Sequence, residues 1–172
     1  MAIVPDSKNW TWVLQQTCPD CSFDAASVDY DEIPSLLRAD VESWRVILAR
    51  PDASVRPNES TWSPLEYAAH VRDVHRIFLT RLGLVLSEDN PTFANWDQDA
   101  TAVVEKYNSS DPAVVAEELA VAADAAADAF AGVPESRRQR AGLRSDGSRF
   151  TVDSLARYYA HDPVHHLWDV RQ

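Results

Sequence analysis

The sequence predicts an all-α protein built as a four-helix bundle with an irregular N-terminal arm. Apolar residues recur with the 3.6-residue period of an amphipathic helix in several long segments. Residues typical of helix starts and ends bracket these segments. The 172 residues include only four glycines, which argues against a many-stranded sheet with tight turns and favours closely packed helices.

The length of the chain is sufficient for one domain with a full hydrophobic core. We expect residues 1–30 to form an arm that packs on the bundle, because no sustained period runs through them. This arm contains Trp10, Trp12, Cys18 and Cys21. Residues 31–172 are expected to form the bundle domain.

The first two helices are predicted on either side of a proline-containing break. Apolar residues follow a helical stripe from Ile33 to Leu48, and residues 49–60 interrupt it with two prolines and several turn formers. The second helix begins at Ser63, where Pro64 and Glu66 complete a capping box, and extends to about Ser87.

The second half of the chain predicts two further long helices. Residues 88–97 are expected to form a loop and 96–108 a short helix. A long alanine-rich helix follows at 111–132, capped by Asp111 and ended by Gly132. After a polar segment, which includes the basic stretch 135–149, the last helix begins at Thr151. The basic stretch is either a solvated connection or a charged loop over a site.

The charge of the chain restricts its partners. Sixteen basic and 27 acidic residues give a net charge of −11, so we expect neither nucleic acid nor an anionic membrane as a partner. There is no uninterrupted apolar run long enough for a membrane span and no recognisable signal peptide. The expected location is the cytoplasm.

All five histidines fall in two short windows of the sequence: His70, His75, His161, His165 and His166. Residues four apart lie on one face of a helix, so the last helix can present His161 and His165 together. His166 is rotated from them by about 100°, and His75 is rotated from His70 by about 140°. We therefore expect neither His166 nor His75 to join its neighbours as a ligand.

A third imidazole, from His70 on a facing helix, would complete a metal site. Three protein ligands leave coordination positions open for water and substrate, as in catalytic metal centres. Imidazoles suit zinc, nickel or iron. The spacing alone also fits histidines that are merely hydrogen-bonded in a core, and Pro163 could kink the last helix or start a new one at Asp162-Pro163.

Two segments resemble the DinB-like superfamily of four-helix-bundle proteins. Residues 61–78 resemble its W-[ST]-x(6)-H-[VL]-x-D pattern, and residues 157–170 contain an H-x3-H pair like that of its final helix. The resemblance covers about residues 31–170. It implies a divalent metal, zinc or nickel, held by His70, His161 and His165. In characterised relatives, which include mycothiol-dependent maleylpyruvate isomerase and bacillithiol transferases, it implies thiol-dependent chemistry.

The preferred function is therefore a metal-dependent transferase or isomerase that acts on a small-molecule substrate with a low-molecular-weight thiol such as mycothiol. A bound cation would lower the pKa of the thiol and so provide a nucleophile at neutral pH. A metal-dependent hydrolase is one alternative. A non-catalytic bundle in which the metal only braces the helices is another. A homodimer is possible in each case.

Six further residues are weaker candidates. Four could orient a ligand or form the pocket rim, although each could equally serve packing or solvation: Asp73, Trp96, Asp97 and Tyr158. The C-x2-C pair of Cys18 and Cys21 is half of a structural zinc signature. It could be a structural pair, a redox pair or part of an added metal site.

Overall fold

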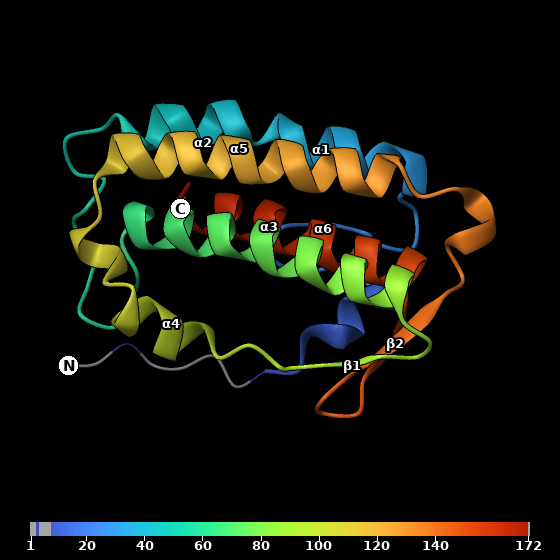
Figure 1. The fold of residues 1–172 in the computed structure, drawn as a ribbon. Coiled ribbons are helices and arrows are strands. Elements are labelled where there is room, and N and C mark those ends of the chain that lie inside the picture. Colours follow the sequence, from blue (N-terminus) through green and yellow to red (C-terminus); the bar gives the residue numbers. More distant parts are fainter. Residues whose placement is uncertain (1–2, 4–7, 172) are drawn as a thin grey trace.

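The computed structural model describes residue 3 and residues 8–171 and has the predicted four-helix-bundle architecture. One layer holds α1, α2 and α5, and the second holds α3 and α6 (Figure 1). The bounds are Ile33–Ala39 (α1), Val41–Leu48 (α2), Pro64–Ser87 (α3), Pro112–Ala131 (α5) and Val152–Asp169 (α6).

The first predicted helix is divided in two. Asp40 separates α1 from α2, whereas the apolar stripe predicted one helix over 33–48. Both pieces still lie against α5, and Arg38 Nε of α1 donates to Asp124 Oδ1 of α5 at 3.0 Å. The two short helices therefore occupy the place of a single bundle helix.

Helix α3 begins as its capping box predicts. The Ser63 hydroxyl accepts from the Glu66 amide, and the Glu66 carboxylate accepts from the Ser63 amide at 2.9 Å. Arg56 Nε also donates to the buried Glu66 carboxylate, at 2.8 Å. This start fixes the rotation of α3, and His70 follows two turns later.

Two segments expected to be loops contribute a small sheet, beneath α3 and α6 in Figure 1. Strand β1 (Thr92–Phe93) pairs in parallel with β2 (Ala141–Arg144), which pairs antiparallel with β3 (Arg149–Thr151). Gly147 turns this hairpin with a φ of +89°, which is the conformation that an Asp-Gly turn favours. Strands of two to four residues are too short to show a period-2 pattern, so the sequence did not predict them.

Arginines of the basic stretch bind the C-terminal end of α3. Arg140 Nε donates to the Val85 carbonyl at 2.9 Å, and the guanidinium groups of Arg137 and Arg140 bind the carbonyls of Leu86 and Glu88. Cations at the C-terminal end of a helix satisfy its unpaired carbonyls and complement its dipole. These arginines therefore cap α3.

Helix α4 (Gln98–Val104) lies beside the loop that follows β1 (Figure 1). It is shorter than the predicted helix at 96–108, and a separate 3₁₀ turn, Tyr107–Ser109, follows it. Asp97 caps α4 by accepting from the Ala100 amide at 2.8 Å.

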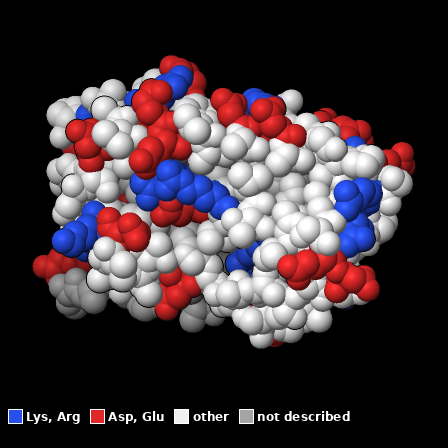
Figure 2. Space-filling model, viewed as in Figure 1, with Lys and Arg blue, Asp and Glu red and all other residues white. Residues whose placement is uncertain are grey.

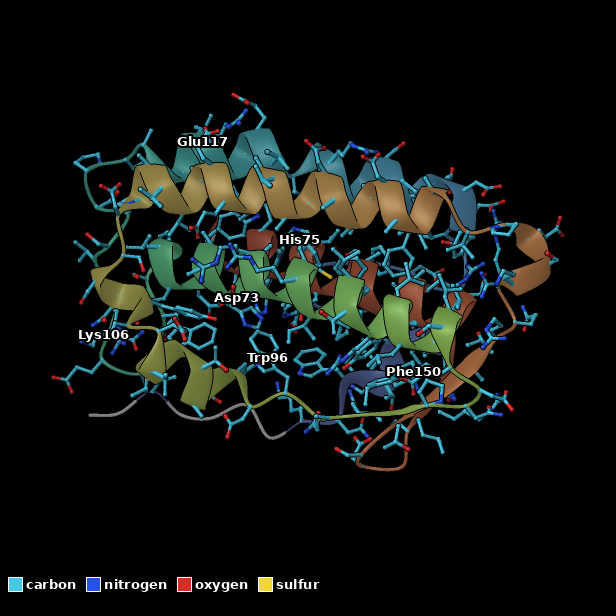
Figure 3. The ribbon with its side chains drawn as sticks, viewed as in Figure 1. Asp73, His75, Trp96, Lys106, Glu117 and Phe150 are labelled. Atoms are coloured by element: carbon cyan, nitrogen blue, oxygen red, sulfur yellow. The ribbon has the colours of Figure 1, made fainter. Side chains whose placement is uncertain are left out.

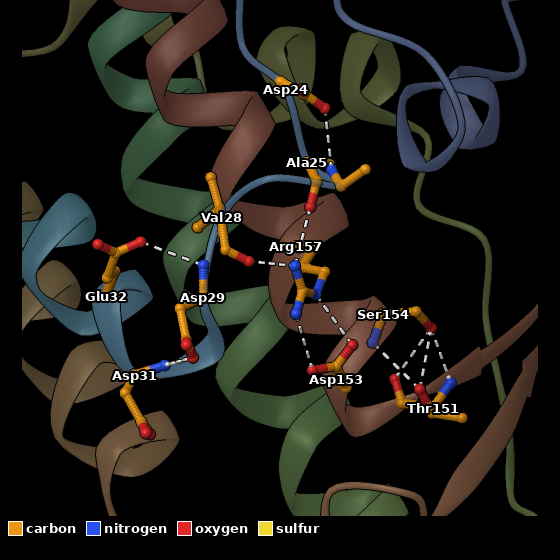
Figure 4. Close-up of polar contacts among 11 residues, drawn as sticks. Asp24, Ala25, Val28, Asp29, Asp31, Glu32, Thr151, Asp153, Ser154 and Arg157 are labelled. Carbon is orange, nitrogen blue, oxygen red and sulfur yellow. Dashed lines mark hydrogen bonds and ion pairs between the residues drawn. The ribbon is translucent and has the colours of Figure 1, made fainter.

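The described part of the N-terminal arm packs against α6. It contains a 3₁₀ turn, Trp10–Leu14, in contact with that helix. Arg157 of α6 donates to the carbonyls of Ala25, at 3.0 Å, and Val28, while Asp153 holds its guanidinium group (Figure 4). Residues 1–2 and 4–7 of the predicted arm lie outside the described residues.

The surface agrees with the acidic composition. On the face shown in Figure 2, acidic and basic side chains are interspersed and form no continuous basic patch. Within the described chain, no helix is both long enough and apolar enough to cross a membrane.

Candidate metal centre

Helix α6 presents two overlapping pairs of possible metal ligands. His161 and His165 form one i, i+4 pair, and Asp162 and His166 form another, one residue further along. The helix continues through Pro163 from Val152 to Asp169, so no new helix starts at the proline. Each pair therefore shares a face, and the two faces differ by about 100°.

Among the described residues, each pair belongs to a separate cluster of potential ligands. Asp162 and His166 join His70, and His161 and His165 join Cys18 and Cys21. Within each cluster the ligand atoms all lie within 4.8 Å of one another.

The structure thus divides the predicted trio of His70, His161 and His165 between two clusters. The reason is the rotation of α6, which turns Asp162 and His166 toward α3 and turns His161 and His165 toward the N-terminal arm. His70 Nε2 lies 3.5 Å from Asp162 Oδ1, and His166 Nε2 lies 3.7 Å from the same oxygen. We call this group, His70, Asp162 and His166, the inner cluster.

His70 is held in an aromatic cage. Its ring stacks on Trp96 with centroids 5.2 Å apart and 4° between the planes, and Trp62 packs at 5.3 Å. Trp96 lies beneath α3, on the side of α4 and the sheet (Figure 3). Its indole nitrogen donates to Thr101 Oγ1 at 2.8 Å, which fixes the ring in place.

The inner cluster contains buried polar atoms that no hydrogen bond satisfies. Both ring nitrogens of His70 and the Oδ1 atom of Asp162 are buried and have no hydrogen-bond partner among the described residues. Such atoms carry a desolvation cost of about 1–3 kcal/mol each when they stay unpaired. A cation between them would satisfy His70 Nε2 and Asp162 Oδ1 together.

The protonation states also fit a cation. Burial lowers the pKa of His70, so its imidazole is neutral at pH 7. Burial alone would raise the pKa of Asp162, but the neighbouring His166 and His70 lower it below its usual value. Neutral imidazole and ionised carboxylate are the forms that coordinate metals.

Asp169 orients the His166 ring through Nδ1, the ring nitrogen that does not face Asp162. Its Oδ2 accepts from His166 Nδ1 at 2.8 Å, which leaves Nε2 directed toward Asp162. A carboxylate behind a histidine is a common support for a metal ligand, because it fixes the tautomer and the ring orientation.

Two pockets meet at the inner cluster. One has a volume of about 240 Å³ and reaches Trp62, His166 and Asp169. The other has about 270 Å³ and reaches Arg81 and Arg144. Both are lined by the same five residues: Trp10, Gln98, Asp99, Tyr158 and Asp162.

The four rim candidates have different surroundings. Trp96 contacts His70 directly, and Tyr158 lines both pockets and accepts from Arg144 Nη1 at 3.1 Å. Asp97 lines the second pocket while it caps α4. Asp73 lies in a separate network, where its carboxylate accepts from Arg72 Nε at 2.9 Å and from the Tyr107 hydroxyl at 2.5 Å.

The sequence did not single out Asp162 as a ligand, and His166 was expected not to be one, whereas the structure groups both with His70. The signal was present, since Asp162 and His166 have the same i, i+4 spacing as the histidine pair. The pattern of histidines alone does not indicate a pair formed by a carboxylate and an imidazole. The two pairs are offset by one residue, and the rotation of α6 decides which of them faces His70. Packing across the bundle sets that rotation.

Comparisons with known proteins agree with this architecture. No curated protein matches the chain. Among solved structures, YfiT from Bacillus subtilis is similar, with a TM-score of 0.64 and 17% sequence identity over 98% of this chain and 91% of that one. YfiT is described as a probable metal-dependent hydrolase with an unusual four-helix bundle topology. The family model of the DinB superfamily matches residues 31–170, and the chain therefore belongs to the DinB superfamily.

Proposed function

We propose that this protein is a divalent-metal-dependent enzyme whose cation is held by His70, Asp162 and His166. The observation that carries the proposal is the convergence of His70 Nε2 and Asp162 Oδ1, both buried and unsatisfied, where two pockets adjoin. The description of YfiT as probably metal-dependent supports it.

Three ligands beside an open pocket favour a catalytic metal over a structural one. Structural zinc sites are usually closed by four protein ligands, whereas catalytic sites keep a position for water or substrate. Two imidazoles and a carboxylate suit zinc and nickel, and this combination also suits iron(II). Metal content is therefore best compared among these three cations.

The cation would supply Lewis acidity, which lowers the pKa of a coordinated thiol or water. The protein positions the ligands for this chemistry: Asp169 fixes the His166 ring, and the cage of Trp62 and Trp96 fixes His70. These aromatic side chains also limit the access of bulk water to His70.

We propose transfer or isomerisation with a small thiol as the reaction. The support is the pair of adjoining pockets, because a two-substrate reaction needs space for both the thiol and the electrophile next to the cation. The cationic side chains of Arg81 and Arg144 in one pocket would suit a carboxylate-bearing partner.

The test is turnover of an electrophile such as monochlorobimane with mycothiol, bacillithiol or glutathione, in protein loaded with zinc, nickel or iron(II). We expect metal-dependent conjugation with one of these thiols and its loss in His166→Ala. His75→Gln is the matched control, because His75 is a buried histidine on α3 that bonds to the Tyr159 hydroxyl and lines neither pocket. Equal activity in His166→Ala and the unmodified protein would contradict the proposal.

Hydrolysis is the second candidate, favoured by the fold shared with YfiT. A hydrolase would turn over ester or amide substrates with the metal present and no thiol added. Absence of both activities, with a cation still bound at the inner cluster, would instead support a non-catalytic, metal-braced bundle.

A further inference from the structure

The second cluster on α6 joins the N-terminal arm to the bundle and supplies no ligand to the cation proposed above. It consists of Cys18 and Cys21 from the arm and His161 and His165 from α6, and we call it the outer cluster. The residues follow C-x2-C and H-x3-H spacings, which are the ligand spacings of Cys2His2 zinc sites.

The distances in the outer cluster fit tetrahedral zinc. All four ligand atoms lie within 4.8 Å of one another, and Cys18 Sγ lies 3.6 Å from His165 Nδ1. Zinc bonds of about 2.3 Å to sulfur and about 2.0–2.1 Å to nitrogen, at the tetrahedral angle, separate the two ligand atoms by about 3.5–3.6 Å. The Cys18–His165 pair already has this separation.

The side chains of the outer cluster are available as ligands. His161 is 4% exposed, and its Nε2 atom is buried with no hydrogen-bond partner in the described part of the chain. Cys18 and Cys21 are both free thiols. An unsatisfied buried imidazole nitrogen beside two free thiols is a costly arrangement that a metal ion would relieve.

Aromatic side chains flank the two histidines of the outer cluster. The Trp10 ring lies 5.5 Å from the ring centroid of His161 and 5.1 Å from that of His165, and Phe23 packs on His161 at 5.9 Å. His161 and His165 also line the first pocket, but four protein ligands would fill a tetrahedral zinc ion and leave it no position for a substrate, which is typical of a structural site.

We propose that the outer cluster binds a structural zinc ion that fastens the N-terminal arm to α6. Zinc is the cation that two thiolates and two imidazoles in tetrahedral geometry favour. Because two of its ligands alternate along α6 with Asp162 and His166, the ion would also fix the rotation of the helix. Asp169 connects the two clusters, since its Oδ1 lies 3.8 Å from His165 Nε2 and its Oδ2 binds His166 Nδ1.

Cobalt substitution tests this proposal independently of any activity. Cobalt(II) bound by thiolates gives an intense charge-transfer absorption in the near ultraviolet, which a site of histidines and carboxylate lacks. We expect this band in the unmodified protein and in His166→Ala, and its loss in the double variant Cys18→Ser, Cys21→Ser. Ser22→Ala, in the same loop, is the matched control and should keep the band.

The unmodified protein offers a second readout that does not depend on a variant folding. Zinc should protect Cys18 and Cys21 from alkylation, and chelation should restore their reactivity. Absence of the charge-transfer band in the cobalt-loaded unmodified protein, together with equal alkylation rates with and without zinc, would overturn the outer site. If instead the inner cluster binds no cation, the metal content of His166→Ala will equal that of the unmodified protein.

Discussion

At the scale of single residues, the Asp169 carboxylate contacts one histidine of each cluster. It bonds to His166 at 2.8 Å and approaches His165 at 3.8 Å. It is also part of the pocket wall. A residue in this position acts on metal affinity through the rings that it orients.

Replacement of Asp169 by Asn should weaken cation binding at the inner cluster by roughly 10–100-fold, because the His166 ring loses its charged partner. Isothermal titration of the metal-free protein would measure the change. Asp128→Asn is the control, since Asp128 of α5 forms an exposed ion pair with Arg38 of α1, in the layer that carries no member of the inner cluster. Unchanged affinity in Asp169→Asn would show that Asp169 does not support cation binding.

Asp73 is expected to contribute to stability rather than to the metal site. It is shared by Arg72, Arg76 and Tyr107, and its pKa is lowered because these hydrogen bonds and charges outweigh its burial. Asp73→Asn should lower the free energy of unfolding by about 1–3 kcal/mol, measured by urea denaturation, while the metal content stays constant. A loss of metal without a loss of stability would place Asp73 in the site after all.

At the scale of elements, the contact between α3 and α6 carries a pH dependence. His75 of α3 is bonded to the Tyr159 hydroxyl of α6, and burial lowers the pKa of His75 to about 4 from an ordinary value near 6.5. Between these two values the unfolded chain binds a proton that the folded chain does not. Protonation therefore favours the unfolded state as the pH falls.

The free energy of unfolding should accordingly decrease as the pH is lowered from about 6.5 to about 4. His75→Gln, compared with the unmodified protein in the metal-free state, should show a shallower decrease, because one titrating group is removed. Urea denaturation across this pH range measures both curves. Parallel curves would show that His75 does not contribute.

The sequence predicts elements of this fold better than it predicts their mutual rotation. The capping residues Ser63, Asp111 and Thr151 mark helix starts that the structure has, since capping depends on neighbouring residues alone. Whether His161 or Asp162 faces α3 depends on the rotation of α6, and that rotation is set by packing across the whole bundle. The C-x2-C and H-x3-H halves of the outer cluster were both visible, but their meeting across 147 residues between Cys18 and His165 is a property of the tertiary fold.

At the scale of the whole molecule, bound cations should stabilise the fold. The inner cluster joins α3 to α6, and the outer cluster joins the arm to α6. A ligand that binds only the folded state stabilises it by about 2.7 kcal/mol when its concentration is a hundredfold above its Kd. For a chain of this size, that corresponds to an increase in Tm of roughly 5–11 °C.

Thermal unfolding with saturating zinc and after chelation would measure this increase. The variant His166→Ala should keep part of it, and a protein that also carries Cys18→Ser and Cys21→Ser should keep almost none. A zinc-dependent increase that survives all three substitutions would mean that the cation binds elsewhere.

The most direct test of the central claim is the position of the cation. A crystal of the zinc-loaded protein, measured on both sides of the zinc absorption edge, would locate the ion by its anomalous scattering. We predict a peak bonded to His70 Nε2, Asp162 Oδ1 and His166 Nε2. A peak that joins His70 to His161 and His165, or no peak beside His70, would contradict the account.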